Sequence, residues 1–135
     1  MSKTQYKMVK PLTYDVKITV KTSFNIGESR PLDQFFVFNY IITIENQSDQ
    51  PLQLLKRHWI IVDSNGEKAE VKGDGVVGKQ PILMPNDKYA YQSHCIFKTP
   101  VGKMSGSYLM KNLAKNEDYL IPINAFRFCM PTLLN

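Results

Sequence analysis

The sequence predicts an all-β fold, an immunoglobulin or fibronectin type III-like two-sheet antiparallel β-sandwich of about seven or eight strands. Three observations predict this fold class. Apolar and polar residues alternate with a period of two through most of the chain. Turn-forming residues recur roughly every ten positions, as in sandwiches with short strands. No segment carries the long 3.6-residue apolar pattern of an amphipathic helix.

The alternating segments fall into seven stretches that we expect to be strands. They are Tyr14–Phe24, Phe35–Glu45, Leu52–Val62, Lys68–Lys72, Tyr89–Lys98, Lys103–Lys111 and Tyr119–Met130, the last being one strand or a pair. The first stretch has apolar residues on one side and Lys17, Thr19 and Lys21 on the other, which indicates one face in the core and one in water. The second stretch is apolar on both faces, so we expect it to be central.

The segments between these stretches predict turns and one loop. Asp63–Gly66 predicts a tight hairpin, because Asn-Gly supplies positive φ angles readily. The loop is Gly73–Pro85, whose glycines and prolines suit irregular backbone. Trp59, the only tryptophan, suits the buried tryptophan between the sheets of such folds.

Length and composition predict one domain over residues 1–135, with a core over about residues 14–131 and a flexible N-terminal segment, 1–13. The N-terminus has no apolar signal region, and no stretch is apolar for the roughly 18 residues that a membrane helix needs. We therefore expect a cytoplasmic protein with no membrane partner. Cys95 and Cys129 form no metal-binding spacing, and we expect both to be reduced thiols that pack in the core.

The formal net charge is +5, supplied mostly by lysines spread along the chain. A positive field favours anionic partners, but no arginine-rich helix or nucleic-acid motif is present, so we expect no nucleic-acid partner. Surplus aromatic surface around Phe35–Phe38 and the exposed edges of a sandwich favour a protein partner. A homodimer formed through such an edge is an alternative.

The segment Gly73–Gln80 carries the strongest chemical signal, since it matches both G-x-G-x-x-G and G-x-x-x-x-G-K. Both motifs normally lead into a helix, and Pro81 and Pro85 argue against one here. A structural loop is one interpretation. The other is a phosphate or pyrophosphate site built from the following residues: Gly73, Gly75, Gly78, Lys79, Lys72 and Arg57.

Strand alternation places Arg57 and Trp59 on one face and His58 on the other. Arg57 either packs its stem at the edge of the core or serves as an anion clamp beside the glycine loop. Ser93 and His94 are adjacent and therefore point to opposite faces, which separates them as nucleophile and base. Histidines and carboxylates show no ligand spacing. We therefore expect no catalytic residues, no metal site and no cofactor.

Four motifs occur in a fixed order along the chain. They are Arg57-His58-Trp59, Gly73-x-Gly75-Val76-Val77-Gly78-x-x-Pro81, Tyr89-x-Tyr91-x-Ser93 and Gly102-x-Met104-x-Gly106-x-Tyr108. In this order the sequence resembles the ApaG family over about residues 14–131. Asn86 stands where the family usually has glycine, and asparagine is the next-best residue for a turn with positive φ.

The resemblance implies a fibronectin type III-like sandwich and a non-enzymatic binding or interaction module. It also implies an association with cobalt resistance and magnesium efflux. The alternative function is a phosphate, pyrophosphate or nucleotide sensor that uses the glycine loop 73–79.

Overall fold

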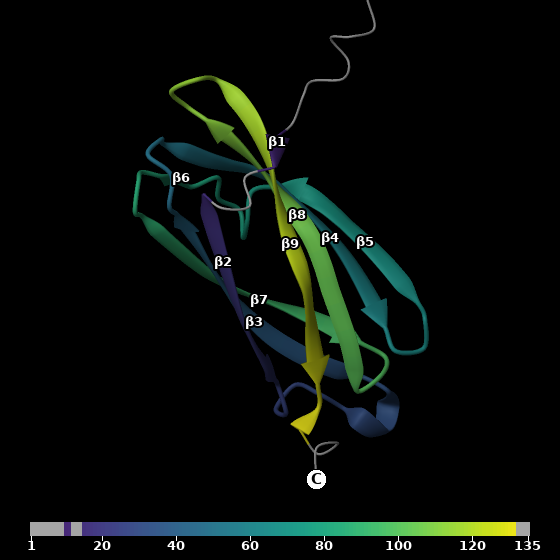
Figure 1. The fold of residues 1–135 in the computed structure, drawn as a ribbon. Coiled ribbons are helices and arrows are strands. Elements are labelled where there is room, and N and C mark those ends of the chain that lie inside the picture. The colour runs from purple at the N-terminus through teal and green to yellow at the C-terminus, as the bar shows by residue number, and fades with distance from the viewer. Residues whose placement is uncertain (1–9, 12–14, 132–135) are drawn as a thin grey trace, which may run out of the picture.

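The computed structural model describes residues 10–11 and 15–131. Most of the N-terminal segment 1–13, which we expected to be flexible, lies outside the described residues, as does Tyr14. The described part is built almost entirely of strands (Figure 1). They are β1 (Lys10–Pro11), β2 (Val16–Phe24), β3 (Phe36–Asn46), β4 (Leu52–Asp63), β5 (Lys68–Asp74), β6 (Ile82–Leu83), β7 (Lys88–Phe97), β8 (Val101–Asn112) and β9 (Glu117–Cys129). A short 3₁₀ turn, Pro31–Asp33, precedes β3.

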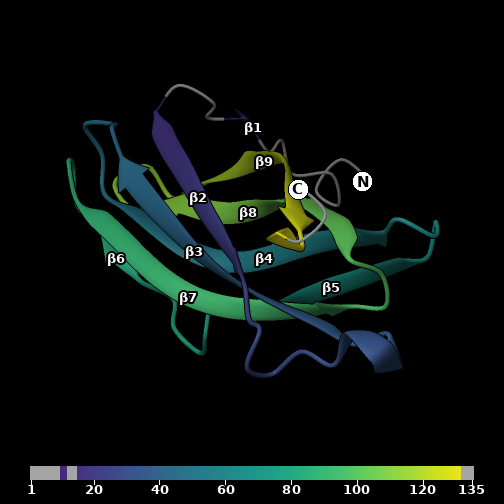
Figure 2. The same cartoon turned by 90° about the horizontal axis from the view of Figure 1, so that it is seen from below.

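The strands form two sheets that pack face to face, which confirms the predicted β-sandwich (Figures 1 and 2). The smaller sheet has the order β2-β3-β7, with β3 in its centre as predicted. The larger sheet has the order β1-β9-β8-β4-β5, and β6 pairs with the start of β4. Neighbouring strands are antiparallel except for β1, which pairs in parallel with β9 at Tyr119 and Leu120.

The core lies between the sheets and follows the predicted alternation. From β3, the inward side chains of Phe36, Phe38, Tyr40, Ile42 and Ile44 are all buried. Trp59 on β4 is 3% exposed and packs edge-on against Tyr40 and Tyr108. Burial of large aromatic and branched side chains is the main source of stability in such a fold.

The structure corrects the predicted boundaries of the glycine-rich segment. Gly73 and Asp74 extend β5 by pairing with Arg57 and Lys56, so the loop starts two residues later than expected. Ile82 and Leu83 pair with β4 as the short strand β6. In the 63–66 hairpin, Gly66 has a positive φ of 91° as its sequence suggests. Asn86 has a φ of 71°, the conformation expected at a position where the family usually has glycine.

Asn46 ends β3 and is fully buried. Its amide nitrogen donates to the carbonyl oxygens of Gln50, at 2.8 Å, and Leu83, at 2.9 Å. Its side-chain oxygen accepts from the backbone N–H and the hydroxyl of Ser48. The side chain therefore joins the 47–51 turn to β6, which fixes one end of the sandwich.

No helix among the described residues is long and apolar enough to cross a membrane.

Candidate functional site

A cleft opens where the two sheets diverge, between β7 on one side and β4 with the 75–79 segment on the other. Its volume is about 280 Å³. It is lined by Tyr40, Arg57, Trp59, Val76, Val77, Tyr91, Gln92, Ser93 and His94. We call it the Arg57 cleft, because Arg57 is the only Lys or Arg among the described residues that line it.

Arg57 is held in this cleft by the backbone that follows β5. Its Nη1 atom donates to the carbonyl oxygens of Asp74 and Gly75, both at 3.0 Å. The guanidinium lies on Gly73, where a β-carbon would stand only 2.8–2.9 Å from Nη1, Cζ and Nη2. The predicted neighbourhood of Arg57 and the glycine loop is therefore present, and Gly73 gives the guanidinium the room to lie there.

The glycine loop itself is a tight backbone hairpin. Val76 N–H donates to the carbonyl of Lys79 at 2.8 Å, and Lys79 N–H donates to the carbonyl of Val76 at 3.0 Å. Gly75 N–H donates to the carbonyl of Leu55 at 2.8 Å. Three backbone donors that a phosphate would need are thus used within the fold. Gly78 and Lys79 lie at the exposed tip.

Lys72 lies on the other face of the larger sheet. It pairs with His58, whose Nε2 is 2.5 Å from a carboxylate oxygen of Glu70. This His58 contact lowers the pKa of Glu70, with a smaller contribution from Lys72. Of the residues predicted for a phosphate site, the structure brings Arg57, Gly73 and Gly75 together at the Arg57 cleft, whereas Lys72 meets Arg57 and Gly73 in a separate hollow on the other face.

The hydroxyl groups around Arg57 stay neutral near neutral pH. Burial is the largest cause that raises the pKa of Tyr40, Tyr91 and Tyr108 above the ordinary tyrosine value, while the charge of Arg57 lowers each only partly. The hydroxyls of Tyr91 and Tyr108 hydrogen-bond to each other. These phenols therefore provide no negative charge for Arg57, and no described acidic side chain forms a salt bridge with it.

Val77 has an unusual backbone at the rim of the cleft. Its φ is 46° and its side chain is 62% exposed. A branched side chain is strained in this left-handed region, and a hairpin of this kind normally carries asparagine or glycine there. An apolar group is thus held at the mouth of the cleft against its conformational preference.

The structure also places the residues that we set aside as catalytic candidates. Ser93 faces the cleft, and the exposed His94 follows it on β7. No three His, Cys, Asp or Glu side chains of the described residues lie close enough together to hold a metal ion. Cys95 is buried, and burial raises the pKa of its thiol to about 12.

The sequence indicated Arg57, Gly73 and Gly75 as candidates but did not indicate the aromatic walls of the cleft. Tyr40, Tyr91 and Ser93 lie in segments that were predicted only as strands. Their common position becomes clear once β3 and β7 are placed side by side, with Tyr40 opposite Ser93. Val77 had a detectable signal, since Val-Gly stands in a turn that favours Asn-Gly.

Comparisons with known proteins place this sandwich in one class of domain. A family profile described as the ApaG domain matches residues 27–112. Protein ApaG of Shewanella halifaxensis is 43% identical over 124 residues, covering 92% of this chain and 98% of that protein. Protein ApaG of Vibrio cholerae is 45% identical over 120 residues, covering 89% of this chain and 94% of that protein.

Solved structures show the same relationship. A crystal structure of an ApaA protein from Bordetella pertussis is 38% identical, with a TM-score of 0.84 and coverage of 92% of this chain and 98% of that chain. The C-terminal domain of wzt has a TM-score of 0.51 at 7% identity, so it shares the fold alone. The chain belongs to the ApaG family, which confirms the resemblance seen in the sequence.

Proposed function

We propose that this protein is a non-enzymatic binding module that holds a protein partner in the Arg57 cleft. The occupant is an acidic side chain of the partner flanked by apolar or aromatic groups. The observation that carries the proposal is a half-buried guanidinium that no described carboxylate pairs, held at the mouth of an aromatic cleft.

The chemistry of the cleft favours this occupant. Within the described part of the chain, only Nη1 of Arg57 has hydrogen-bond partners, which leaves Nε and Nη2 to donate to a carboxylate in a two-point contact. Two backbone acceptors already hold the guanidinium in place, which lowers the entropy lost on binding. Val77 offers exposed apolar area beside the charge, and the nearly buried rings of Tyr40 and Trp59 lie behind it.

A phosphate or pyrophosphate ligand is the second candidate. It shares the Arg57 guanidinium, and Lys79 lies at the tip of the hairpin that borders the cleft. The glycine loop provides few further hydrogen-bond donors for a phosphate, because the N–H groups of Gly75, Val76 and Lys79 already donate to carbonyls. The apolar walls therefore support a protein side chain over a free phosphate.

The association with cobalt resistance and magnesium efflux fits the same proposal. A module that holds a transport or regulatory protein would change divalent-cation levels through that protein, without coordinating the ion itself. The Arg57 cleft is cationic, which favours an acidic partner over a metal ion.

An amide NMR titration with three probes tests the proposal. The probes are acetyl-Phe-Glu-Phe-amide, its neutral counterpart acetyl-Phe-Gln-Phe-amide, and pyrophosphate. We expect saturable shifts at Arg57, Val76 and Val77 with the Glu peptide, with a dissociation constant of about 1 mM for so small an anchor. The Gln peptide should bind several-fold more weakly, and Arg57→Gln should remove the difference between the two peptides.

The three probes separate the candidate functions. Saturable shifts at Lys79 with pyrophosphate, and none with either peptide, would favour the phosphate sensor. Equal binding of the Glu and Gln peptides would show that the guanidinium recognises no carboxylate. That result would remove the proposed role of the Arg57 cleft.

A further inference from the structure

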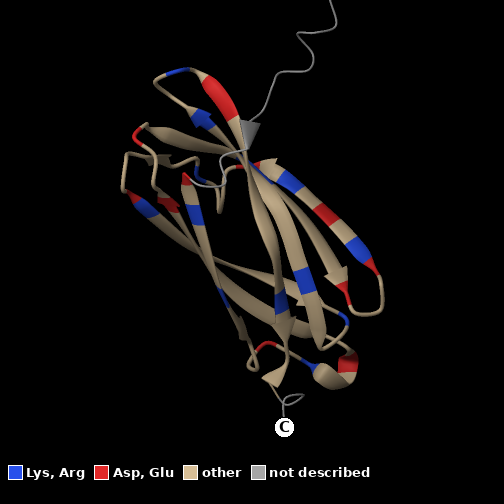
Figure 3. Ribbon diagram, in the orientation of Figure 1, with Lys and Arg blue, Asp and Glu red and all other residues tan. Residues whose placement is uncertain are grey.

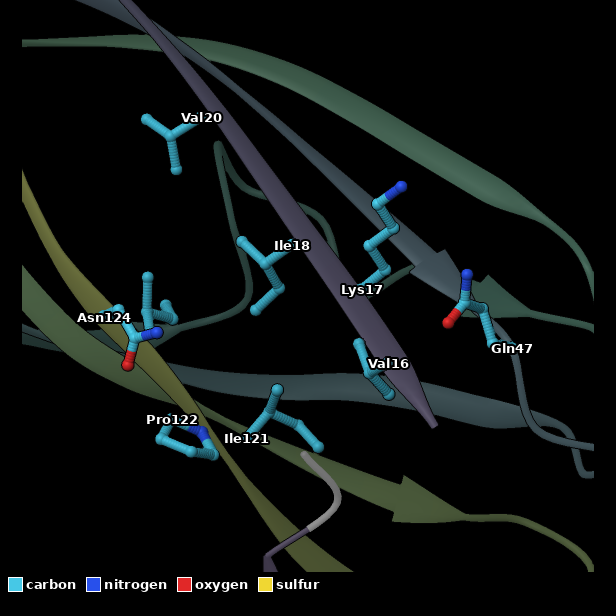
Figure 4. A pocket seen from close by; sticks show the side chains of 9 residues that line it. Val16, Lys17, Ile18, Val20, Gln47, Ile121, Pro122 and Asn124 are labelled. Carbon is cyan, nitrogen blue, oxygen red and sulfur yellow. The ribbon is translucent and has the colours of Figure 1, made fainter. Parts of the chain in front are cut away.

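A second open side of the sandwich lies opposite the Arg57 cleft, between β2 and β9. Here a groove of about 420 Å³ separates the edge of the smaller sheet from the larger one (Figure 4). It is lined by Val16, Lys17, Ile18, Val20, Gln47, Ile121, Pro122, Ile123 and Asn124. We call it the β2 groove.

The β2 groove combines an apolar floor with polar rims. Figure 4 shows Val16, Ile18 and Val20 projecting from β2 on the side where Ile121 and Asn124 of β9 lie, whereas Lys17 leaves β2 on the other side. Among the residues that the structure describes, the lining contains one lysine and no acidic residue. The volume lies within the roughly 300–1,000 Å³ usual for binding pockets.

The backbone of β2 adds an unused pairing edge to this groove. β2 pairs with β3 without interruption from Val16 opposite Asn46 to Phe24 opposite Phe38. No other described strand pairs with β2, so every second residue directs its N–H and C=O groups away from β3. β2 also contains no proline and no bulge.

The other edges of the sandwich carry features that block the addition of a strand. β5 presents alternating basic and acidic side chains (Figure 3). β9 contains Pro122, which has no N–H, and a bulge opposite Met104–Gly106. The 75–79 hairpin lies beside β7, since both line the Arg57 cleft. Such devices are the usual protection of exposed edges, and β2 has only Lys17 and Lys21.

The two lysines, Lys17 and Lys21, also favour a partner segment of negative charge. Lys17 lies opposite Glu45 of β3, whereas Lys21 lies opposite Ile41 and has no acidic residue across the strand pair. A second copy added through its own β2 in the fully overlapping antiparallel register would place four lysines on one face as diagonal neighbours, which is repulsive. An added strand with acidic residues on that face would meet complementary charges.

We propose that β2 and the β2 groove bind an extended acidic segment of a partner protein by strand addition. The segment alternates apolar residues, which enter the groove beside Ile18 and Val20, with Glu or Asp residues, which lie beside Lys17 and Lys21. The inference rests on the proposed role as a protein-binding module. It uses a surface on the opposite side of the sandwich from the Arg57 cleft, so the two can fail separately.

Three capped heptapeptides, titrated into the full chain, test the inference. Acetyl-EVEIEVE-amide carries the proposed pattern, acetyl-KVKIKVK-amide reverses its charge, and acetyl-EVEPEVE-amide places proline at its centre. We expect saturable amide shifts along β2 and slower hydrogen exchange of its outward N–H groups with the first peptide. The lysine and proline peptides should each bind about tenfold more weakly.

Charge reversal of the protein provides the decisive control. The double variant Lys17→Glu with Lys21→Glu should prefer the lysine peptide over the glutamate peptide, and Lys21→Glu alone should have the larger single effect. Arg57→Gln should leave the amide shifts along β2 unchanged, although it should weaken any binding of the glutamate peptide at the Arg57 cleft. If Arg57→Gln abolishes the shifts along β2, the peptides act through the Arg57 cleft, and strand addition at β2 is wrong.

Two further outcomes would overturn the inference. Equal affinity for all three peptides, or no shifts along β2 at millimolar peptide, would exclude an acidic strand at this edge. Sedimentation that shows a concentration-dependent dimer, with β2 amides protected in the dimer, would make a second copy of this chain the occupant instead.

Discussion

The guanidinium of Arg57 lies over Gly73 across the β4–β5 pair, so that no side chain could stand at position 73 without moving Arg57. The absence of a side chain at Gly73 therefore serves the placement of Arg57. The first glycine of the G-x-G-x-x-G pattern therefore has a different role here from its role in nucleotide-binding loops, where it allows close approach of a phosphate. Here it allows close approach of a cation.

Replacing Gly73 with alanine tests this relationship. The new methyl group would displace the flexible end of Arg57 and break its two bonds to Asp74 and Gly75. We expect the free energy of unfolding to change by no more than about 1 kcal/mol, because the displaced group can reach water. Affinity for acetyl-Phe-Glu-Phe-amide should fall about tenfold.

The control for this variant is Gly27→Ala, where a β-carbon would meet only the Asn25 side chain at an ordinary 3.6 Å. Urea denaturation and the peptide titration measure both variants. Unchanged peptide affinity in Gly73→Ala would show that the position of Arg57 has no part in binding.

Gly106→Ala, in contrast to Gly73→Ala, should strongly lower the free energy of unfolding. A β-carbon at Gly106 would lie 1.9 Å from the carbonyl oxygen of His58 and 3.0 Å from the ring of Trp59. Backbone and a buried ring cannot move aside as a guanidinium can, so we expect a loss of more than about 3 kcal/mol. A urea midpoint as high as that of Gly73→Ala would contradict the distinction between the two glycines.

The strained backbone of Val77 predicts that a substitution which relieves the strain will stabilise the fold but weaken peptide binding. Asparagine accepts positive φ more readily, so Val77→Asn should raise the free energy of unfolding by about 0.5–1 kcal/mol. It should also weaken peptide binding, since the apolar rim of the Arg57 cleft is lost. Thermal denaturation and titration of the same sample measure both effects. A variant that is more stable and binds equally well would show that Val77 has no part in recognition.

The fold was predictable from the sequence because apolar and polar residues alternate along each strand, and this pattern can be read from neighbouring residues alone. The inward faces of β3 and β7 follow directly from the alternation of Phe35–Glu45 and Tyr89–Lys98. The hairpin at Asp63–Gly66 follows from local turn chemistry. These signals are short-range, and each concerns residues that are neighbours in the chain.

The candidate site was only partly predictable, because its members meet through the packing of two sheets. Alternation places Arg57 on the core side, but its contact with Gly73 depends on the β4–β5 register. The position of Lys72 outside the Arg57 cleft could be predicted from the alternation of β5, provided that the strand was known to continue through Gly73. The β2 groove required knowledge of which strands form edges, and that is a property of topology rather than of local pattern.

The buried amide of Asn46 predicts a strong local dependence of stability. Asn46→Ala removes four side-chain hydrogen bonds and leaves the carbonyl of Leu83 without this donor in a buried setting. We expect a loss of about 2–4 kcal/mol. Asn112→Ala is the matched control, because Asn112 is also buried and accepts from the N–H groups of Ala114 and Lys115 in its own turn. Urea denaturation should show the larger loss for Asn46→Ala, and equal losses would contradict its role as a link between elements.

Alkaline pH should destabilise the protein through its buried acids. Burial raises the pKa of Tyr40, Tyr91 and Tyr108, and that of Cys95 to about 12, above their values in the unfolded chain. Their contribution is therefore fully present below about pH 9, the ordinary range of a thiol, and is lost as the pH rises through 10 and beyond. Each group should reduce the free energy of unfolding by up to about 1.4 kcal/mol per pH unit in that window.

Urea denaturation between pH 7 and pH 11, followed together with tyrosinate absorbance, measures this dependence. The double variant Tyr91→Phe with Tyr108→Phe should show a shallower loss above pH 10, because two of the four groups no longer titrate in the unfolded chain. The rise in tyrosinate absorbance on unfolding at alkaline pH should also be smaller in this variant, since it lacks two phenols that ionise only on unfolding. Stability that stays level to pH 11 in the wild-type protein would mean that these hydroxyls reach solvent in the folded state, and that the Arg57 cleft is wetter than its aromatic walls indicate.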